Sequence, residues 1–560
     1  MVQAASGPVP SAAGEDLALR DRAAAVLQGN DAGGWTRAAP RLYPHQWSWD
    51  SAFIAIGWAH LDTGRALTEL EGLFAAQWPT GMVPHIVFRA GPDHPYFPGP
   101  EWWDCAIAAP SLPAKTTGIC QPPVHALAVR RIWELTPPDA RPEIRARIQT
   151  LYPRLVAWHR YLATQRDPEA SGLVTTYHPW EGTDNSPRWD RALARIQAPD
   201  PGPYTRLDTS ELGDPSQRPA DWDYDRYLHL VGLLRKYRYD DALIYRHYPF
   251  LIKDVFFSAV LVAANAALLD LADVAGASDG DREQLAGWLD RGRAGLAARF
   301  DAGSGLCVDY DVRAEQDIRL RTFATFAPLF ARAADAGQRD AQLRLLDSGD
   351  FCGDPRLRWR LLPSTSPAEP AFESRTYWRG PVWPVISWLL TEALTALGAA
   401  DRAVEMRRDS LAQIAGDGDF AEYYEPFTGK PLGSQRQSWT AAVTLDWLAA
   451  SRLPVLPCGL PGFGHIGRAA ERRRDQQAHR ERVRGRCGGR LGLEFGDCEA
   501  AHFGRAPVPL PGGTDPLLPD QLPVARRALV AVSDDGRFQP VPTRVAVSTT
   551  LNSVSVVTAI

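Results

Sequence analysis

Cysteine is sparse in this 560-residue chain and follows no recognisable pattern. The seven cysteines occur singly, and no two of them form a Cys-x-x-Cys pair. Structural zinc sites and the disulfide frameworks of secreted proteins both depend on such spacings. The sequence therefore argues against both kinds of site. An odd number of single cysteines favours a reducing compartment, which predicts a cytoplasmic protein.

Targeting and membrane signals are also lacking. The N-terminus has neither a basic segment nor an apolar core, so we expect no signal peptide. The longest apolar run, Phe256–Leu269, is too short and too polar at its flanks to predict a membrane span. The formal net charge of −5 does not favour nucleic acid or an anionic membrane as a partner. The sequence does not reveal an oligomeric state.

Alternating strand patterns are scarce before residue 455, and helical patterns dominate instead. Apolar residues recur every three or four positions in 142–165, where they are Ile144, Ile148, Leu151, Leu155, Trp158 and Leu162. The predicted helices span 17–29, 50–61, 64–77, 121–135, 142–165, 222–237, 250–275, 281–299, 319–335, 378–397, 401–415 and 437–452. This pattern predicts an all-α fold.

The character of the chain changes near both ends. Residues 1–16 are mostly small and polar, and we expect them to be disordered. Residues 17–455 form the predicted catalytic domain. Residues 456–560 contain an Arg-rich run and a Pro- and Gly-rich stretch, which predict an irregular, disordered tail. The Arg-rich run is typical of a solvated tail more than of a nucleic-acid patch, because acids are interspersed and aromatics are few.

Two acidic and aromatic segments carry the chemistry. Residues His178–Asp190 combine Glu181, Asp184 and Asp190 with two tryptophans, and Phe420–Gly429 contains Glu422. Aromatic faces stack on the C–H faces of sugars, and a carboxylic acid in a partly dry pocket can remain protonated. A glycoside hydrolase needs a pair of carboxyl groups, about 6.5–9.5 Å apart when the reaction inverts the anomeric centre.

Five further segments contain tryptophan, tyrosine and charged residues in loop-like contexts. They are Arg41–Asp50, Trp78–His85 with Tyr96–Trp103, Gly118–Pro123, Arg218–Tyr224, and Tyr377–Trp383 with Gln437–Thr440. Each is a weak signal alone; the Trp-Ser-Trp-Asp sequence ending at Asp50, for example, is also typical of packing and a helix N-cap.

In this order, the segments resemble glycoside hydrolase family 63, and most closely its bacterial mannosylglycerate and glucosylglycerate hydrolases. The resemblance covers roughly residues 20–453. It implies an (α/α)6 toroid, like that of six-hairpin glycosidases, and hydrolysis with inversion. Asp184 matches the general acid of the family, and Glu422 matches its general base. Between Trp180 and Asp184 the chain has one residue fewer than the family pattern, which predicts a shifted Asp184.

The resemblance also implies a substrate-binding set. Tyr43, Gln121, Arg218 and Tyr224 match positions that hold the carboxylate and hydroxyl of glycerate. The sugar is expected to contact Trp47, Trp49, Asp50, Trp180, Glu181, Tyr377, Trp378, Gly380, Trp383 and Gln437. An Arg suits a substrate carboxylate because its planar fork binds both oxygens. We therefore predict that Arg218 binds the carboxylate of the aglycone. Its loss should leave Asp184 and Glu422 unaffected. No metal-ligand spacing and no phosphate-binding loop occur, so no cofactor is predicted.

Three other interpretations remain open at this stage. Arg218 could instead form a surface ion pair with Asp221 or Asp225, since such pairs are common. The enzyme could be a family 63 glucosidase acting on neutral disaccharides or oligosaccharides, which predicts no cation facing the aglycone. The toroid could be a non-catalytic sugar-binding protein, which predicts the loss of one carboxylate. The sequence leaves glucosyl and mannosyl substrates equally open.

Overall fold

The computed structural model describes residues 12–450, except residues 92, 93 and 95. The predicted tail, 456–560, and the first eleven residues lie outside the described residues. Residues 12–16, which the sequence predicts to be disordered, belong to helix α1 (Ala12–Asn30). The prediction was therefore wrong for this turn, in which Glu15 lies at the positive end of the helix dipole.

Six helices form a closed inner ring. Each contacts the next along the chain, and the last contacts the first. They are α2 (Ser48–Ala59), α5 (His125–Leu135), α11 (Val255–Ala275), α13 (Ala327–Phe330), α15 (Pro384–Ala396) and α17 (Ser438–Ala450). Every residue of α2 is buried, as is most of α11 and α17, because these helices are covered on all sides.

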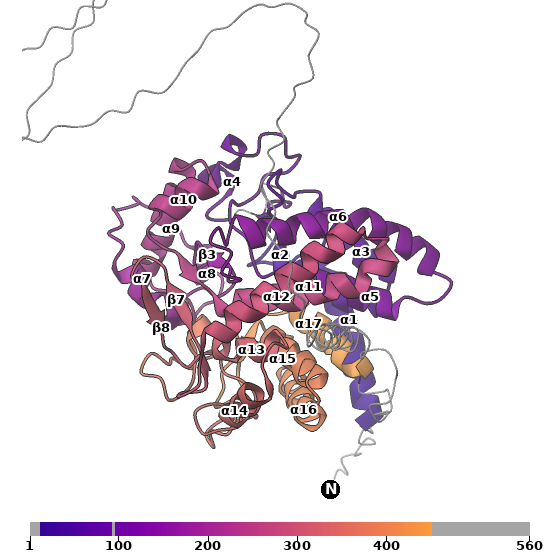
Figure 1. Cartoon of the computed structure of the whole chain (residues 1–560). Coiled ribbons are helices and arrows are strands. Elements are labelled where there is room, and N and C mark those ends of the chain that lie inside the picture. The colour runs from indigo at the N-terminus through magenta and orange to yellow at the C-terminus, as the bar shows by residue number, and fades with distance from the viewer. Residues whose placement is uncertain (1–11, 92–93, 95, 451–560) are drawn as a thin grey trace, which may run out of the picture. The chain divides into compact units, whose positions relative to one another are not determined.

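Six outer helices alternate with the inner ones along the chain and pack against them (Figure 1). They are α1, α3 (Thr63–Phe74), α6 (Arg141–Thr164), α12 (Asp279–Ala298), α14 (Ala336–Leu346) and α16 (Ala400–Asp417). This alternation of outer and inner helices is an (α/α)6 toroid, as the resemblance implied. The six apolar residues singled out in 142–165 are all buried in α6, so its predicted amphipathic period is confirmed.

Shorter elements fill the loops that precede the inner helices. The short helices are α4 (Pro100–Trp103), α7 (Asp190–Ala194), α8 (Leu207–Ser210) and α10 (Asp241–His247), and α9 (Asp221–Lys236) is longer. Figure 1 shows α4, α9 and α10 lying together, away from α14 and α16. Five 3₁₀ turns span Cys105–Ile107, Pro187–Trp189, Pro215–Gln217, Phe323–Phe326 and Tyr377–Arg379.

The strands of the described residues are two or three residues long and pair antiparallel. One sheet has the order β3 (Thr175–Thr176), β4 (Ile252–Lys253), β7 (Asp309–Asp311) and β8 (Gln316–Ile318). The other pairs are β1 (Gln46–Trp47) with β2 (Ile86–Val87), β5 (Phe300–Asp301) with β6 (Leu306–Cys307), and β9 (Tyr423–Tyr424) with β10 (Pro431–Leu432). The β1–β2 and β9–β10 pairs tie together loops of the site described below.

Several helices begin later than the sequence predicts, for identifiable reasons. Prolines at 122, 123 and 381 delay α5 and α15, because proline is tolerated only in the first turn of a helix. Helix α11 begins after Asp254, whose carboxylate accepts hydrogen bonds from the backbone N–H groups of Phe256 and Phe257. The predicted helix 319–335 is wrong in extent: Pro328 and the left-handed Arg332 limit it to a 3₁₀ turn and α13.

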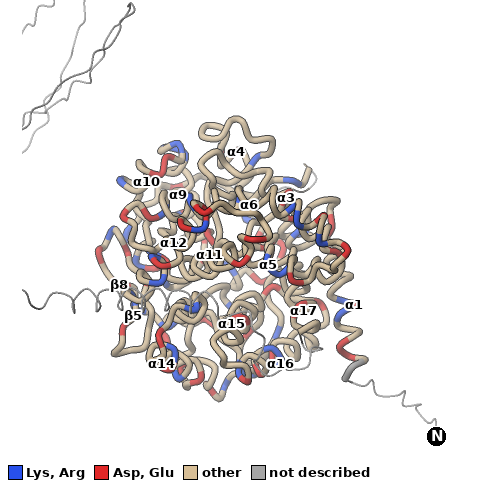
Figure 2. Tube along the Cα trace, turned by 45° about the vertical axis from the view of Figure 1, so that its right-hand side comes forward, with Lys and Arg blue, Asp and Glu red and all other residues tan. Residues whose placement is uncertain are grey.

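By length and composition alone, helix α11 could cross a membrane. The expectation that its apolar run, Phe256–Leu269, is too short for a span was therefore wrong about its length. Most of its residues are buried in the protein, where it packs against α5, α6, α12 and α13. Acidic and basic residues are mixed along the outer helices, as Figure 2 shows for α3, α14 and α16. Ion pairs join some neighbours, such as Arg147 of α6 with Glu71 of α3 at 2.7 Å.

Candidate active site

One pocket collects the loops that precede the inner helices α2, α5, α11, α15 and α17. It encloses about 900 Å³ of empty space, including space open to solvent. The amino ends of several inner helices meet there, and such ends favour negative charge. The lining residues are Leu42, Tyr43, Trp47, Trp49, Asp50, His85, Ile86, Tyr96, Phe97, Pro98, Trp103, Gln121, Trp180, Gly182, Asp184, Leu207, Asp208, Arg218, Pro219, Tyr224, Tyr377, Trp378, Glu422, Gln437 and Trp439.

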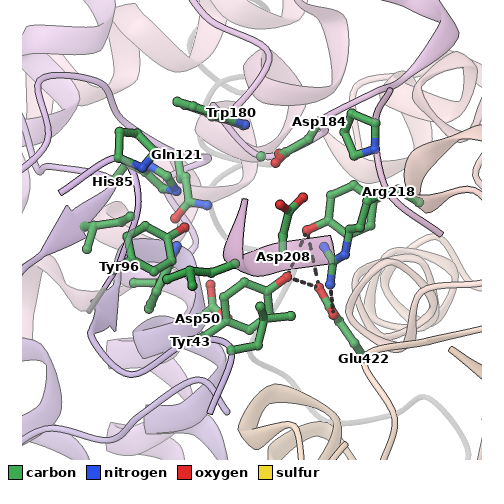
Figure 3. Close-up of a pocket in the computed structure, with 18 of the residues that line it drawn as sticks. Tyr43, Asp50, His85, Tyr96, Gln121, Trp180, Asp184, Asp208, Arg218 and Glu422 are labelled. Atoms are coloured by element: carbon green, nitrogen blue, oxygen red, sulfur yellow. Dashed lines mark hydrogen bonds and ion pairs between the residues drawn. The ribbon is translucent and has the colours of Figure 1, made fainter. Parts of the chain in front are cut away.

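The structure brings most of the predicted site residues into this pocket. Those that line it are Asp184 and Glu422 together with Tyr43, Trp47, Trp49, Asp50, Gln121, Trp180, Arg218, Tyr224, Tyr377, Trp378 and Gln437. Figure 3 shows Asp184 and Glu422 entering from different walls. Residues from the two ends of the domain thus meet because the ring closes α17 onto α2.

Glu422 is held by four hydrogen-bond donors. Its Oε1 accepts from the hydroxyls of Tyr43 at 2.8 Å and Tyr377 at 3.3 Å. Its Oε2 accepts from Nη2 of Arg218 and from the backbone N–H of Ser434, both at 2.9 Å. Donors to a carboxylate stabilise its charged form, so this arrangement suits a general base.

A β-hairpin fixes the position of Glu422. Glu422 immediately precedes β9, and its backbone N–H donates to the carbonyl of Ser434, just beyond β10. Gly433 has a φ of +71°, and a Cβ at this position would lie 2.5 Å from Oε2 of Glu422. Only glycine allows both this turn and the close approach of the carboxylate.

Asp184 lies in a loop that is anchored to the inner helical ring. Arg188, four residues on, donates to the carboxylates of Asp254 and Asp309, the first of which caps α11. Burial, together with the carboxylates of Glu422 and Asp208, raises the pKa of Asp184 to about 7, although its own backbone N–H and Arg218 oppose the shift. A carboxyl group with this pKa is protonated below neutrality, as a general acid requires.

Asp50 is a buried carboxyl group that lines the pocket from helix α2. It occupies the third position of α2, not the N-cap, which is Trp47. Burial raises its pKa, and the carboxylate of Glu422 adds to the shift. The neighbouring Trp49 packs edge-on against Trp439, and its ring centroid lies 6.1 Å from that of Trp378. Aromatic rings beside a buried carboxyl group are the features of a sugar subsite.

Several polar atoms on the pocket wall lack hydrogen-bond partners among the described residues. They are Nδ1 of His85, Nε1 of Trp103, Nε of Arg218 and Nε1 of Trp439. A buried polar group without a partner costs about 1–3 kcal/mol. Oxygen atoms of a polar ligand would supply the missing partners. Burial lowers the pKa of His85 to about 3, so its ring is neutral at pH 7.

Arg218 lines the pocket and does not form the surface ion pair that the sequence left open as an alternative. The surface ion pair with Asp221 is absent from the described contacts of Arg218, because Arg206 binds Asp221 instead, with Nη1 3.0 Å from Oδ1. Arg218 is buried, pairs with Glu422, and lies over the ring of Tyr377 at 4.3 Å. It therefore contacts the predicted base directly, contrary to the expectation that it acts independently of the catalytic pair.

Three predicted residues do not line the pocket. Glu181 accepts hydrogen bonds from Arg166, Cys120 and Tyr177, and its ion pair with Arg166 is completely buried. It supports the loop rather than the sugar. Trp383 stacks behind Trp378, with ring centroids 3.9 Å apart. Gly380 packs against the backbone of Glu373, where a Cβ would lie 2.4 Å from its carbonyl oxygen.

Five further residues with polar side-chain atoms line the pocket but were not predicted from the sequence. His85, Tyr96, Trp103 and Trp439 lie inside motif segments, but nothing local distinguished them from their neighbours. Asp208 lies outside every such segment, in the stretch between the Asp184 loop and Arg218. Its pairing with Arg206 two residues earlier was the available signal, since the two side chains hydrogen-bond at 2.7 and 3.1 Å.

The known proteins to which this chain is similar include hydrolases of glucosylglycerate and mannosylglycerate. Residues 43–440 match the family described as the mannosylglycerate hydrolase MGH1-like glycoside hydrolase domain. The chain is 47% identical over 437 residues to a glucosylglycerate hydrolase of Mycolicibacterium hassiacum, covering 77% of this chain and 97% of that protein. It is 43% identical over 428 residues to a mannosylglycerate hydrolase of Thermus thermophilus, covering 76% and 99%.

Solved structures agree with the sequence comparison. A crystal structure of a family 63 mannosylglycerate hydrolase from Thermus thermophilus, in complex with Tris and D-glycerate, superimposes with a TM-score of 0.71. The identity is 42%, and the match covers 77% of this chain and 99% of the other. The same enzyme in complex with glucose gives a TM-score of 0.68.

Proposed function

This chain belongs to glycoside hydrolase family 63, within the group of MGH1-like mannosylglycerate hydrolase domains, and on this basis we propose that it hydrolyses an α-hexoside of glycerate. The substrate is glucosylglycerate or mannosylglycerate, and the products are the free hexose and glycerate. The observation that carries the proposal is that one pocket holds both Asp184, whose pKa burial raises to about 7, and Glu422, which accepts four hydrogen bonds.

The two carboxyl groups have different roles because their environments differ. Asp184 has few donors and a raised pKa, so it donates its proton to the glycosidic oxygen as the bond breaks. Glu422 is surrounded by donors that stabilise its negative charge, so it accepts a proton from the attacking water. Attack from the face opposite the leaving group inverts the anomeric centre.

Arg218 supports an acidic aglycone. Among the pocket-lining residues that the structure describes, it is the one Arg or Lys, and His85 is neutral. A guanidinium has five N–H donors. One of the donors on Nη2 serves Glu422, and Nε has no partner among the described residues. The remaining donors can bind the glycerate carboxylate, so Arg218 contacts both the base and the substrate.

We infer that the hexose lies on the opposite side of the scissile bond. Trp49, Trp180 and Trp378 provide aromatic faces, and Asp50 and Gln437 provide polar groups. The cysteines that the structure describes, at 105, 120, 307 and 352, are free and buried. We infer that the enzyme works in the cytoplasm, where free thiols persist.

A product assay tests the proposal. Purified protein would be incubated separately with glucosylglycerate, mannosylglycerate, trehalose and kojibiose, and released hexose and glycerate would be quantified. We expect turnover of one or both α-hexosides of glycerate and little release of hexose from the neutral disaccharides. Glu422→Gln serves as the inactive control, and Glu211→Gln, an exposed carboxylate outside the pocket, as the matched active control. Faster hydrolysis of a neutral disaccharide would contradict the proposal and favour a neutral glucosidase.

A further inference from the structure

Asp208 is a carboxylate in the pocket for which the reaction described above provides no role. It lies on α8, lines the pocket, and its side chain is 21% exposed. In Figure 3 its carboxylate points into the space beside Asp184. We propose that Asp208 accepts a hydrogen bond from the free hydroxyl of the hydroxy acid and thereby determines which acid, and which enantiomer of it, is released. This inference rests on the proposed function.

Asp208 is held in one orientation. Arg206 donates to it from Nε at 3.1 Å and from Nη2 at 2.7 Å, which is a bidentate contact. Arg206 is itself fixed, because Nη1 donates to the carbonyl of Pro219 at 2.7 Å and its guanidinium lies 4.4 Å from the ring centroid of Tyr224. The position of Asp208 is therefore coupled to the segment that carries Arg218 and Tyr224.

The neighbours of Asp208 belong to the aglycone side of the pocket. Burial raises the pKa of Tyr96 and of Tyr224, and in both cases the Asp208 carboxylate adds the next largest increase. Asp208 also contributes to the raised pKa of Asp184, which faces the glycosidic oxygen. Asp208 therefore lies in the same pocket as Asp184, Tyr96 and Tyr224, within reach of a small aglycone bound there.

Glycerate joins four different groups at the carbon bonded to the glycosidic oxygen. They are that oxygen, a carboxylate, a hydroxymethyl group and a hydrogen atom. The carboxylate of Asp208, which accepts two hydrogen bonds from Arg206, can accept another from a hydroxyl but repels a second carboxylate. Arg218 has the opposite preference, because a guanidinium only donates.

Three contacts around one carbon distinguish its two mirror images. Asp184 contacts the glycosidic oxygen, Arg218 the carboxylate, and Asp208 the hydroxyl. In the wrong enantiomer, two of these groups exchange places. The carboxylate then faces Asp208 and the hydroxymethyl group faces Arg218. A lactate aglycone of the correct hand keeps its carboxylate on Arg218 but leaves Asp208 without a partner.

The test compares three substrates that differ only in the aglycone: the α-glucosides of D-glycerate, L-glycerate and D-lactate. For the wild type we expect kcat/KM to be about 10- to 100-fold higher for the D-glycerate substrate than for D-lactate, the range of a hydrogen bond to a charged group. Asp208→Ala should bring this ratio near one. Asp208→Asn, which keeps an acceptor oxygen, should retain part of it. Glu211→Gln, on the same loop but outside the pocket, should leave the ratio unchanged.

The outcomes separate the two proposals. If the wild type hydrolyses none of the acidic glycosides, the proposed function fails. If it hydrolyses D-glycerate, L-glycerate and D-lactate substrates equally well, the proposed function stands and the role of Asp208 is overturned. An Asp208→Ala enzyme that loses activity equally on all three substrates shows a structural role and also overturns it. If Asp208→Ala does not fold, the isosteric Asp208→Asn variant decides: a ratio lowered from the wild-type value supports the role of Asp208, and an unchanged ratio overturns it.

Discussion

Arg218 donates from Nη2 to Oε2 of Glu422 across 2.9 Å, and the two side chains are 3% and 1% exposed. This buried pair connects Glu422, the predicted base, with Arg218, the residue predicted to bind the aglycone. Removing one partner of a buried ion pair leaves an uncompensated charge and costs about 3–5 kcal/mol. A substitution at Arg218 therefore removes a hydrogen bond that holds Glu422 in place, as well as a donor for the substrate.

Arg218→Ala should lower kcat at least about tenfold on a neutral aryl α-glucoside and on the glycerate substrate, since the lost hydrogen bond to a charged group is worth about 1.5–3 kcal/mol. KM should rise only for the acidic substrate, because only that substrate has a carboxylate to bind. Steady-state kinetics on both substrates measure the two effects. Unchanged kcat on the neutral glucoside would show that Glu422 does not depend on Arg218.

Asp184→Asn and Glu422→Gln should each lower kcat by about 10²–10⁴, the usual worth of general acid or base assistance. Both substitutions keep the size of the side chain, so substrate affinity measured by calorimetry should change little. Glu181→Gln provides a contrast, since Glu181 pairs with Arg166 behind the pocket and its loss should reduce thermal stability more than turnover. Near-normal kcat in either catalytic variant would remove that residue from the mechanism.

The pH dependence should reflect the proton on Asp184. Burial, with Glu422 and Asp208, raises the pKa of Asp184 to about 7, and only the protonated form can donate. The value of kcat/KM should therefore be highest below this pKa and fall about tenfold per pH unit above it. Asp184→Asn, measured with an activated aryl glucoside that needs no acid, should lack this decline. A wild-type profile that stays flat to pH 9 would contradict the assignment.

The reaction should invert the anomeric configuration. Proton NMR recorded during the first minutes of hydrolysis should show the β anomer of the hexose released from an α-linked substrate. The α anomer then appears only by mutarotation. Initial release of the α anomer would instead indicate a covalent intermediate, and Glu422 would have to act as a nucleophile.

Local sequence patterns were enough to predict the all-α fold and the two segments that carry the carboxyl pair. The period of apolar residues in α6 predicted its buried face, and the spacing of helices predicted an all-α chain. The acidic and aromatic segments around Asp184 and Glu422 were recognisable because loops with prolines, tryptophans and acids differ from helix patterns. Such features depend on residues that are close in the chain, so a sequence displays them directly.

Contacts between distant residues were decided only by the tertiary structure. Arg218 and Glu422 are 204 positions apart, and no local pattern indicates that they pair. Glu181 and Asp184 are three positions apart in one loop, yet one is buried against Arg166 and the other lines the pocket. Asp208 has no motif around it and still enters the pocket. Closure of the helical ring sets these positions, because it determines which side of each loop faces the pocket and which faces the core.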